Sequence, residues 1–538
     1  MVSQLLAFLK SGLGKKEKLF LSYGVLCVTI FVLYTSSLPY FLKLWVDGVL
    51  ETKDEHFLVR FGIILSLVTL VAILIDWLGA YLLIKVRETS RAEIRLKLIN
   101  QLQRMPVSEV EKKESGYFTE VLLSDVDYAT GMIVSIVYMV VPAAVSLPAS
   151  VYWSFKLSSC FAIIGLIGFV LIFANVYLFS SILRRLSADR QDLYSKASGV
   201  IQESILGNFF IRLSQMEEQI GKRNWSVLNS LKESSIKKHL VDYSAGTVER
   251  FVTQILQVVA VFAGLYLIIA FKSELTAAAV MTGIFYLIKI WSPINMLSSL
   301  NADFQGALAS SKRISDIIES KAEAQAGEVV LGEGLADIEC TGVSIKIGAK
   351  KLIENLNLRI QLGSKLGIKG KSGCGKTTLL KTLFGFYQDW TGSIKYNDIE
   401  LKDVKKTDLL SRIGYMPQDV FVFRENLHFN IALNYSHDSV RMQETIRKFH
   451  LERLFGQTGQ ESLIPANISG GEKKRIGLAR LFYADKEAIV LDEPFSGLDG
   501  QTRKTIFDEI TMLFKDKTVI IVSHDERDLA WCDLKIDL

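Results

Sequence analysis

Six apolar stretches constrain the fold of this chain more than any other feature of its sequence. They lie at residues 19–42, 61–84, 132–153, 158–180, 251–271 and 276–300. Each is close to the roughly 20 residues that an α-helix needs to cross about 30 Å of hydrocarbon. We therefore predict that the first 300 residues form an all-α membrane domain with six spans.

Basic residues beside these stretches indicate how the spans are oriented. Lys10, Lys15, Lys16 and Lys18 precede the first stretch, whereas the first connecting loop, ETKDEHF, is mostly acidic. The next loop, KVRETSRAEIRLK, is strongly basic. Loops rich in Lys and Arg remain in the cytoplasm. We expect an integral protein of the cell membrane, the inner membrane if the source is bacterial. Its N-terminus and its C-terminal half would then both be cytoplasmic.

The connections between the stretches differ in length. Only WSFKLSS separates the two middle stretches, which predicts a tight helical hairpin. The segments 85–130 and 181–250 are long and polar but keep helical spacing of apolar residues, so we expect the helices to continue well beyond the bilayer. The predicted domains are a transmembrane domain at 1–310, a polar linker at 311–334 and a nucleotide-binding domain at 335–538.

Charge and cysteine content exclude some function classes. The net charge of +5 is small for 538 residues, and much of the basic excess lies beside apolar stretches. We therefore expect no nucleic-acid partner. The five cysteines are scattered and none forms a C-x-x-C pair, so neither a disulfide framework nor a zinc site is expected.

A glycine-rich turn, GKSGCGKT, follows an apolar strand and precedes an apolar helix in the C-terminal half. It fits the pattern G-x-x-x-x-G-K-[ST]. The backbone N–H groups of such a loop converge on phosphate oxygens, and the helix N-terminus adds partial positive charge. Lys376 is predicted to reach the β- and γ-phosphates, and Thr377 to hold Mg²⁺. The nucleotide-binding residues expected here are Gly370, Lys371, Ser372, Gly373, Cys374, Gly375, Lys376, Thr377 and Thr378.

The run AIVLDEP reads as a buried parallel strand that delivers two carboxylates to its C-terminal end. A strand ending in Asp-Glu is weak evidence for a catalytic site by itself. Together with the phosphate loop, it becomes strong evidence for one. We expect Asp492 to support Mg²⁺ and Glu493 to act as the general base for the attacking water.

Between these two motifs, ISGGEKKRIGLAR resembles the signature motif of the ATP-binding cassette (ABC) family. Other motifs of the family follow in order. The resemblance implies that Gln418 of YMPQ senses Mg²⁺ and the membrane domain, that Asp499 of FSGLD crosses to the opposite cassette, and that His524 of IVSHD contacts the γ-phosphate. ATP and Mg²⁺ are the implied cofactors.

The membrane half resembles exporters of the same family. RMPVSEVEKKESGYFTEVLLSDVD and ESILGNFFIRLSQMEEQ are similar to their two intracellular loops, which carry short coupling helices. FQGALASSKRISDIIE resembles the bridge into the cassette. The implied fold is a type I exporter-like six-helix domain followed by an α/β P-loop NTPase cassette.

The resemblance also implies an assembly. In this family ATP lies between the phosphate loop of one cassette and the signature motif of another, here Ser469, Gly470 and Gly471. One chain carries one of each motif, so a dimer is expected. Two identical chains would form two complete sites, and a paired non-identical half is the alternative.

Four residues depart from simple expectations. Ile347 stands where the family usually has an aromatic residue that stacks on adenine, so selectivity for ATP over GTP is in doubt. Glu472 replaces the common glutamine and adds negative charge near the nucleotide interface. Asp76 and Lys289 lie inside predicted spans, where ionisable groups are costly. They are expected either to line the substrate cavity or to serve as structural charges.

These features together predict ATP-driven export of a small amphipathic substrate by alternating access. A small or modified peptide of the bacteriocin kind is the expected substrate. Lipid flipping or multidrug export is the alternative, and an ATP-gated channel or regulator is more distant. Membrane lipid and the exported substrate are the expected partners besides the second chain.

Overall fold

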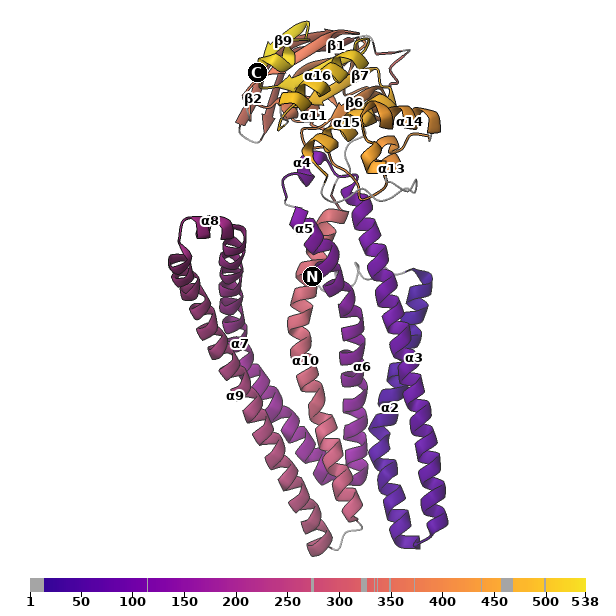
Figure 1. Ribbon diagram of the computed structural model, residues 1–538. Helices are drawn as coiled ribbons and strands as arrows, with labels where there is room; N and C mark the ends of the chain where they lie inside the picture. Colours follow the sequence, from indigo (N-terminus) through magenta and orange to yellow (C-terminus); the bar gives the residue numbers. More distant parts are fainter. Residues whose placement is uncertain are drawn as a thin grey trace. The chain divides into compact units, whose positions relative to one another are not determined.

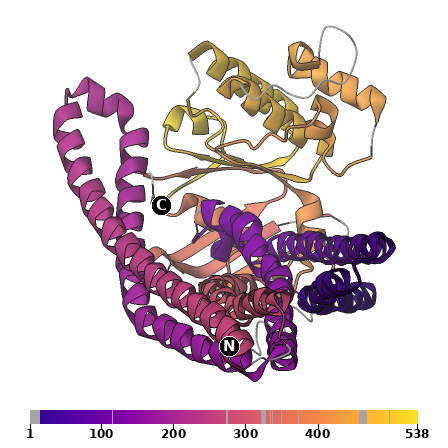
Figure 2. The ribbon, with the colours of Figure 1, turned by 90° about the horizontal axis from the view of Figure 1, so that it is seen from below.

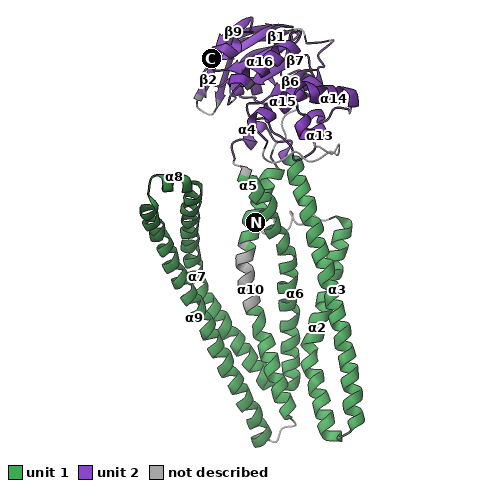
Figure 3. Cartoon of the chain, in the orientation of Figure 1, with its two compact units in different colours: residues 1–101, 115–319 green, residues 102–114, 320–538 purple. Residues whose placement is uncertain are grey.

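A computed structural model describes residues 14–113, 115–271, 275–320, 327–332, 334–335, 337–347, 350–371, 373–436, 438–455, 468–497 and 500–538. Its internal contacts divide the chain into two compact units (Figure 3). The first unit comprises residues 1–101 and 115–319, and the second comprises residues 102–114 and 320–538. The second unit therefore takes a short segment from the N-terminal half of the chain.

The first unit is all helical (Figure 1). Its helices are α2 (Lys15–Thr52), α3 (Glu55–Leu102), α5 (Ser115–Glu120), the π-helix η1 (Val121–Asp125), α6 (Val126–Leu157), α7 (Ser159–Leu206), α8 (Asn208–Leu213), α9 (Glu217–Phe271) and α10 (Ala277–Ile318). In the described part of the chain, six helices are long and apolar enough to cross a membrane. The predicted six-span helical domain is confirmed.

The long helices extend beyond their apolar stretches, as predicted. Helix α7 has 48 residues, which is about 72 Å at 1.5 Å per residue and more than twice the thickness of a hydrocarbon core. Helix α9 has 55 residues, and the two lie side by side (Figures 1 and 2). The tight hairpin between α6 and α7 is also confirmed, since Ser158 alone separates them and caps α7 by accepting a hydrogen bond from Cys160 N at 3.3 Å.

Small residues allow close approach between membrane helices. The Trp291 side chain of α10 lies against Gly165 and Gly168 of α7 and donates from Nε1 to the Gly165 carbonyl at 2.9 Å. A Cβ atom at Gly168 would lie 2.4 Å from that nitrogen. Close backbone approach at small residues is a main source of packing energy between helices in lipid.

The π-helix η1 carries a polar cluster in the first unit. The extra residue in each turn of a π-helix disturbs the usual i to i−4 bonding, and Arg95 of α3 donates to the Leu122 and Leu123 carbonyls at 2.9 and 3.3 Å. Asp125, the last residue of η1, is only 2% exposed. Its carboxylate accepts hydrogen bonds from Ser310 and Arg313 of α10.

The second unit contains two sheets. A four-stranded antiparallel sheet has the order β2-β1-β4-β5, and a five-stranded parallel sheet has the order β6-β7-β8-β3-β9. The strands are β1 (Asp337–Ile347), β2 (Lys350–Gln361), β3 (Lys365–Lys369), β4 (Trp390–Tyr396), β5 (Ile399–Glu400), β6 (Ile413–Met416), β7 (Ala488–Asp492), β8 (Thr518–Ser523) and β9 (Leu534–Asp537). Strands β7 and β8 are buried throughout, as their continuous apolar sequence requires.

Helices accompany these sheets and complete the predicted α/β cassette. They are α4 (Val107–Val110), α11 (Lys376–Leu383), α12 (Lys406–Arg412), α13 (Leu427–Ala432), α14 (Ser439–Lys448), the 3₁₀ turn η2 (Glu452–Phe455), α15 (Gly470–Ala484), α16 (Gly500–Leu513) and the 3₁₀ turn η3 (Glu526–Leu529). In open parallel sheets, ligands bind beyond the carboxyl ends of the strands. In this sheet β6, β7, β8 and β3 are neighbours, so the residues that follow these four strands come together.

Candidate functional site

The glycine-rich loop joins β3 to the N-terminus of α11, as its sequence predicted. Gly373 and Gly375 have φ values of +80° and +107°, which side chains rarely tolerate. The Lys376 side chain, 7% exposed, folds back over this loop and donates to the Gly370 and Lys371 carbonyls at 2.8 and 3.1 Å. The loop and the ammonium group form the kind of backbone cradle that binds phosphate.

Thr377 and Asp492 form the part of the site that suits a metal ion. Thr377 Oγ1 donates to Asp492 Oδ2 at 3.0 Å, and the Tyr415 hydroxyl lies 3.3 Å from the same oxygen. Burial raises the pKa of the Asp492 carboxyl, although hydrogen bonds from Thr377 and Tyr415 oppose the shift. A cation would offset the cost of burying this charge.

The two oxygens, a hydroxyl and a carboxylate, are of the kind that Mg²⁺ takes as ligands. Their separation is about that of adjacent ligands around Mg²⁺ bound at roughly 2.0–2.1 Å. Within the described residues no group of three or more His, Cys, Asp or Glu side chains is arranged to hold a metal.

Glu493 lies at the centre of the polar groups around the phosphate loop. Its Oε2 accepts a hydrogen bond from Gln418 Nε2 at 2.9 Å, and its Oε1 lies 3.7 Å from His524 Nδ1 and 3.8 Å from Lys376 Nζ. The side chain is 15% exposed. The structure thus brings together three predicted residues from the ends of β6, β7 and β8, and a carboxylate placed in this way can accept a proton from water.

The backbone at Glu493 is strained. Its φ of +46° lies in the left-handed region, and Pro494 follows it, which further restricts the residue before it. Such a conformation costs of the order of 1–3 kcal/mol and persists only where surrounding contacts hold it. The contacts here are a hydrogen bond from Glu493 N to Val522 O at 2.9 Å and several donors at the Glu493 carbonyl.

Ser469 caps α15, the helix that begins within the signature motif. Its hydroxyl accepts from Glu472 N at 3.2 Å, and the Glu472 carboxylate accepts from Ser469 N and from the Ser469 hydroxyl at 2.8 Å each. This is a reciprocal capping box. The hydrogen bond from Ser469 N, followed by the one from the Ser469 hydroxyl, lowers the pKa of Glu472. The expected negative charge is therefore present, but it has a structural role at the helix start.

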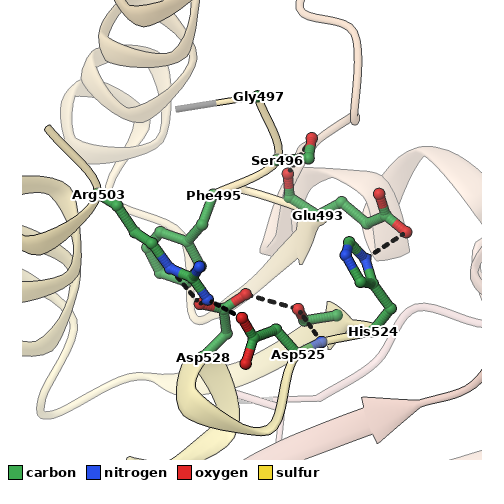
Figure 4. Close-up of a pocket in the computed structure, with 9 residues that line it drawn as sticks. Glu493, Phe495, Ser496, Gly497, Arg503, His524, Asp525 and Asp528 are labelled. Atoms are coloured by element: carbon green, nitrogen blue, oxygen red, sulfur yellow. Dashed lines mark hydrogen bonds and ion pairs between the residues drawn. The ribbon is translucent and has the colours of Figure 1, made fainter. Parts of the chain in front are cut away.

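A pocket of about 170 Å³ opens beside Glu493 and His524 (Figure 4). Arg503 of α16 lines it and donates to Asp528 from Nε at 3.0 Å and to Asp525 from Nη2 at 2.6 Å. The Ser523 hydroxyl donates to Asp528 and accepts from Asp525 N. The residues before and after His524 are thus fixed by one network, and hydrogen bonds from Arg527 and Arg503 lower the pKa of Asp525.

Some expected site residues are not tested by the structure. Ser372 and Asp499 lie outside the described residues. Ile347 is the last residue of β1, and the residues after it, 348–349, are likewise not described, so the lack of an adenine-stacking aromatic stays a prediction. Asp76 lies in α3 and Lys289 in α10, and among the described residues they do not form an ion pair with each other.

Sequence reasoning missed three residues of this site. Tyr415 shares Asp492 with Thr377, and Arg503 fixes the segment around His524. Lys474 donates to the backbone carbonyls of Gln418 and Glu493. Lys474 lies inside a motif that the sequence singled out, ISGGEKKRIGLAR. A lysine on the buried face of the helix that this motif forms could have indicated a role in the site. Tyr415 also lies in a motif that the sequence singled out, YMPQ, but nothing there marked it as a partner of Asp492, and Arg503 had no local sign.

Comparison with known proteins identifies both units. Residues 21–291 match the family described as ABC transporter transmembrane region, and residues 353–496 match the family described as ABC transporter. The chain resembles an ATP-dependent lipid A-core flippase of Desulfotalea psychrophila, with 25% identity over 91% of this chain and 87% of the relative. It also resembles the Lactococcin-G-processing and transport ATP-binding protein LagD of Lactococcus lactis, with 25% identity over 94% of this chain and 73% of the relative.

A solved structure shares the whole fold. A bacterial Atm1-family ABC exporter with ATP bound matches with a TM-score of 0.75 and 17% identity, covering 96% of this chain and 93% of that one. At this identity the match concerns the fold. Both the six-helix unit and the α/β unit are therefore found joined in one chain elsewhere.

Proposed function

The chain belongs to the ABC transporter family, and from that premise we propose that two copies of it export an amphipathic lipid across the cell membrane. The protein is an integral membrane ABC exporter half, and it hydrolyses ATP to drive transport. The observation that carries the ATP hydrolysis in this proposal is the convergence of Lys376, Gln418 and His524 on Glu493 beside the phosphate loop.

The proposed chemistry assigns one role to each group. The loop N–H groups and Lys376 bind the β- and γ-phosphates. Thr377, Asp492 and Gln418 would hold Mg²⁺, which would supply positive charge that neutralises the phosphates. Glu493 accepts a proton from the attacking water, and His524 contacts the γ-phosphate. Catalysis of phosphoryl transfer depends mostly on positioning and charge stabilisation of this kind.

A second copy completes the site in this proposal. Ser469, Gly470 and Gly471 at the start of α15 would meet the nucleotide held by the phosphate loop of the partner. The half-transporter fold implies dimerisation, and a homodimer is the simplest form because Lys376, Glu493, His524 and the signature serine are all present in this chain. Nucleotide-driven closure of two cassettes would then alternate access to a central cavity.

The substrate proposal rests on chemistry and on relatives. The expected substrate from sequence was a small peptide, and one relative is named for the transport of lactococcin G. Relatives in several bacteria are named lipid A-core flippases, and this favours a lipid with a large polar head. A small amphipathic peptide remains the second candidate.

Reconstitution into liposomes tests the function. We expect ATP hydrolysis by the purified protein to rise several-fold with an amphipathic lipid, and labelled lipid to move between leaflets only with ATP. Stimulation by peptides alone would favour the second candidate. Absence of hydrolysis in every lipid and peptide condition would contradict the proposal.

A further inference from the structure

One buried cation near Glu493 has no role in the proposed chemistry. Lys474 lies on α15, the helix that begins at the signature motif, and it is 6% exposed. A buried ammonium group is costly unless it is hydrogen-bonded and faces opposite charge. Its presence therefore needs a compensating role.

The hydrogen bonds of Lys474 join two functional segments. Nζ donates to the Gln418 carbonyl at 2.9 Å and to the Glu493 carbonyl at 2.8 Å. Both acceptors belong to residues whose side chains also bond to each other, Gln418 Nε2 to Glu493 Oε2 at 2.9 Å. One ammonium group thus closes a ring through the two residues.

The Glu493 carbonyl is also the point at which the strained backbone is held. Besides Lys474, it accepts from Ser496 N at 3.2 Å and from the Ser496 hydroxyl at 3.1 Å. Figure 4 shows Ser496 beside Glu493 among the residues that line the pocket. Since φ at Glu493 is +46°, these donors are among the contacts that hold the backbone in this conformation.

Charge surrounds Lys474 in a consistent way. Burial lowers its pKa, and the carboxylates of Asp419, Glu493 and Asp492 oppose that shift. The ammonium group lies among the acidic residues of the catalytic centre and offsets part of their mutual repulsion. Loss of this cation would therefore change both geometry and local potential.

We propose that Lys474 is a positioning residue. It holds the backbone of Gln418 and Glu493 in a fixed position relative to α15 of the same cassette. The inference rests on the proposed function, in which the start of α15 serves the nucleotide of the partner. A shift of α15 on meeting that nucleotide then moves the general base of its own site. Lys474 provides a direct physical connection between the two nucleotide sites of the dimer.

The test compares Lys474→Met with Lys365→Met in the full-length protein in liposomes. Methionine keeps most of the stem volume but removes the donors. Lys365 is a matched control because it is also buried and donates to the Gly363, Lys515 and Lys517 carbonyls, far from Glu493 in the sequence. We expect Lys474→Met to lower kcat for ATP by about tenfold or more, with KM changed by less than about twofold. Lys365→Met should lower the melting temperature while leaving kcat within about twofold.

Rescue separates positioning from bulk. Lys474→Gln keeps two N–H donors and should recover a large part of kcat. Equal kcat in Lys474→Met and wild type would overturn the proposal, and so would parallel losses of kcat and melting temperature in Lys474→Met and Lys365→Met. If Lys474→Met does not fold, Lys474→Leu replaces it, and failure of both to fold would show a purely structural role.

The wild-type measurement keeps the two hypotheses apart. Absence of ATP hydrolysis by the wild type contradicts the proposed function itself. Hydrolysis by the wild type together with an unaffected Lys474→Met variant contradicts only the role of Lys474.

Discussion

Asp125, buried at the end of the π-helix η1, accepts a hydrogen bond at 2.6 Å from Nε of Arg313, which lies 188 residues later in the sequence. A second bond from the same guanidinium and one from the Ser310 hydroxyl at 2.8 Å complete the cluster. Helix α10 is thereby fixed to the start of α6 within the first unit.

Breaking this pair should destabilise the membrane unit. Arg313→Ala leaves the buried Asp125 carboxylate without its charge partner. Because the Arg313 side chain is 41% exposed and water screens the pair, we expect a loss of about 1–3 kcal/mol. We expect a lower melting temperature in detergent, measured by thermal unfolding followed with intrinsic fluorescence. Arg313→Ala together with Asp125→Asn should recover part of the loss, because no buried charge remains. A double variant as unstable as Arg313→Ala alone would argue against this account.

Glu493→Gln should abolish turnover while preserving nucleotide binding. The amide cannot accept the proton of the attacking water, so hydrolysis should fall by about 10²–10⁴-fold. Binding of a fluorescent ATP analogue should remain near that of the wild type. Asp508→Asn, at an exposed position of α16, is the control and should hydrolyse ATP normally. Hydrolysis within a few-fold of wild type in Glu493→Gln would exclude Glu493 as the general base.

Glu111 and Lys381 allow a charge-swap experiment inside the second unit. Lys381 Nζ donates to both carboxylate oxygens of Glu111 at 2.7 and 2.8 Å, next to α4. Exposed pairs contribute only about 0–1 kcal/mol, so stability should hardly change. We expect Glu111→Lys and Lys381→Glu each to reduce substrate-stimulated hydrolysis, and the double swap to restore it.

The control for that experiment is another exposed pair in the same unit. Lys517 Nζ lies 2.9 Å from Asp485, away from α4 in the sequence. Lys517→Glu should leave stimulation unchanged. If substrate stimulates hydrolysis by the double swap no more than hydrolysis by the single variants, the pair does not couple substrate binding to ATP hydrolysis.

Glu472→Gln should raise the rate of hydrolysis. Glutamine keeps the capping partner of Ser469 but removes a negative charge from the start of α15, where phosphate is expected to approach. A change of about 1 kcal/mol corresponds to roughly fivefold in rate or ATP affinity. Steady-state hydrolysis against ATP concentration measures it. A slower enzyme with normal affinity would show that the carboxylate itself is required.

The same residue has a testable pH dependence. Hydrogen bonds from Ser469 lower the pKa of Glu472, so its stabilisation is fully present above the ordinary carboxyl pKa and is lost as pH falls through the lowered value. Melting temperature measured against pH should therefore decline more steeply on the acidic side for wild type than for Glu472→Gln. Identical profiles would show that the capping carboxylate contributes nothing to stability.

Local motifs account for what the sequence predicted. Lys376 and Thr377 directly follow the glycine-rich loop, at the start of α11, and the apolar stretches define their helices by length alone. Both features could therefore be predicted without tertiary structure. The ends of β6, β7 and β8 could be expected to converge because carboxyl ends of parallel strands share one edge.

Long-range pairs account for what the sequence did not reveal. Arg503 meets Asp525, and Arg313 meets Asp125, only after the chain has folded. Both acids lie in segments that the sequence singled out, but nothing there indicates which arginine each one binds. The hydrogen bonds between Glu472 and Ser469 were not predicted for a related reason. The charge of Glu472 was visible in the sequence, whereas the hydroxyl that it binds was set by the backbone at the start of α15.

The segment 102–114 leaves the membrane unit, joins the cassette and is followed by a return to the membrane unit. The chain consequently passes between the units three times, around residues 101–102, 114–115 and 319–320. A body attached by one flexible tether can turn in any direction, but each additional attachment removes some of those rotations. The three covalent connections therefore restrict the rotations that the cassette can make relative to the helical unit.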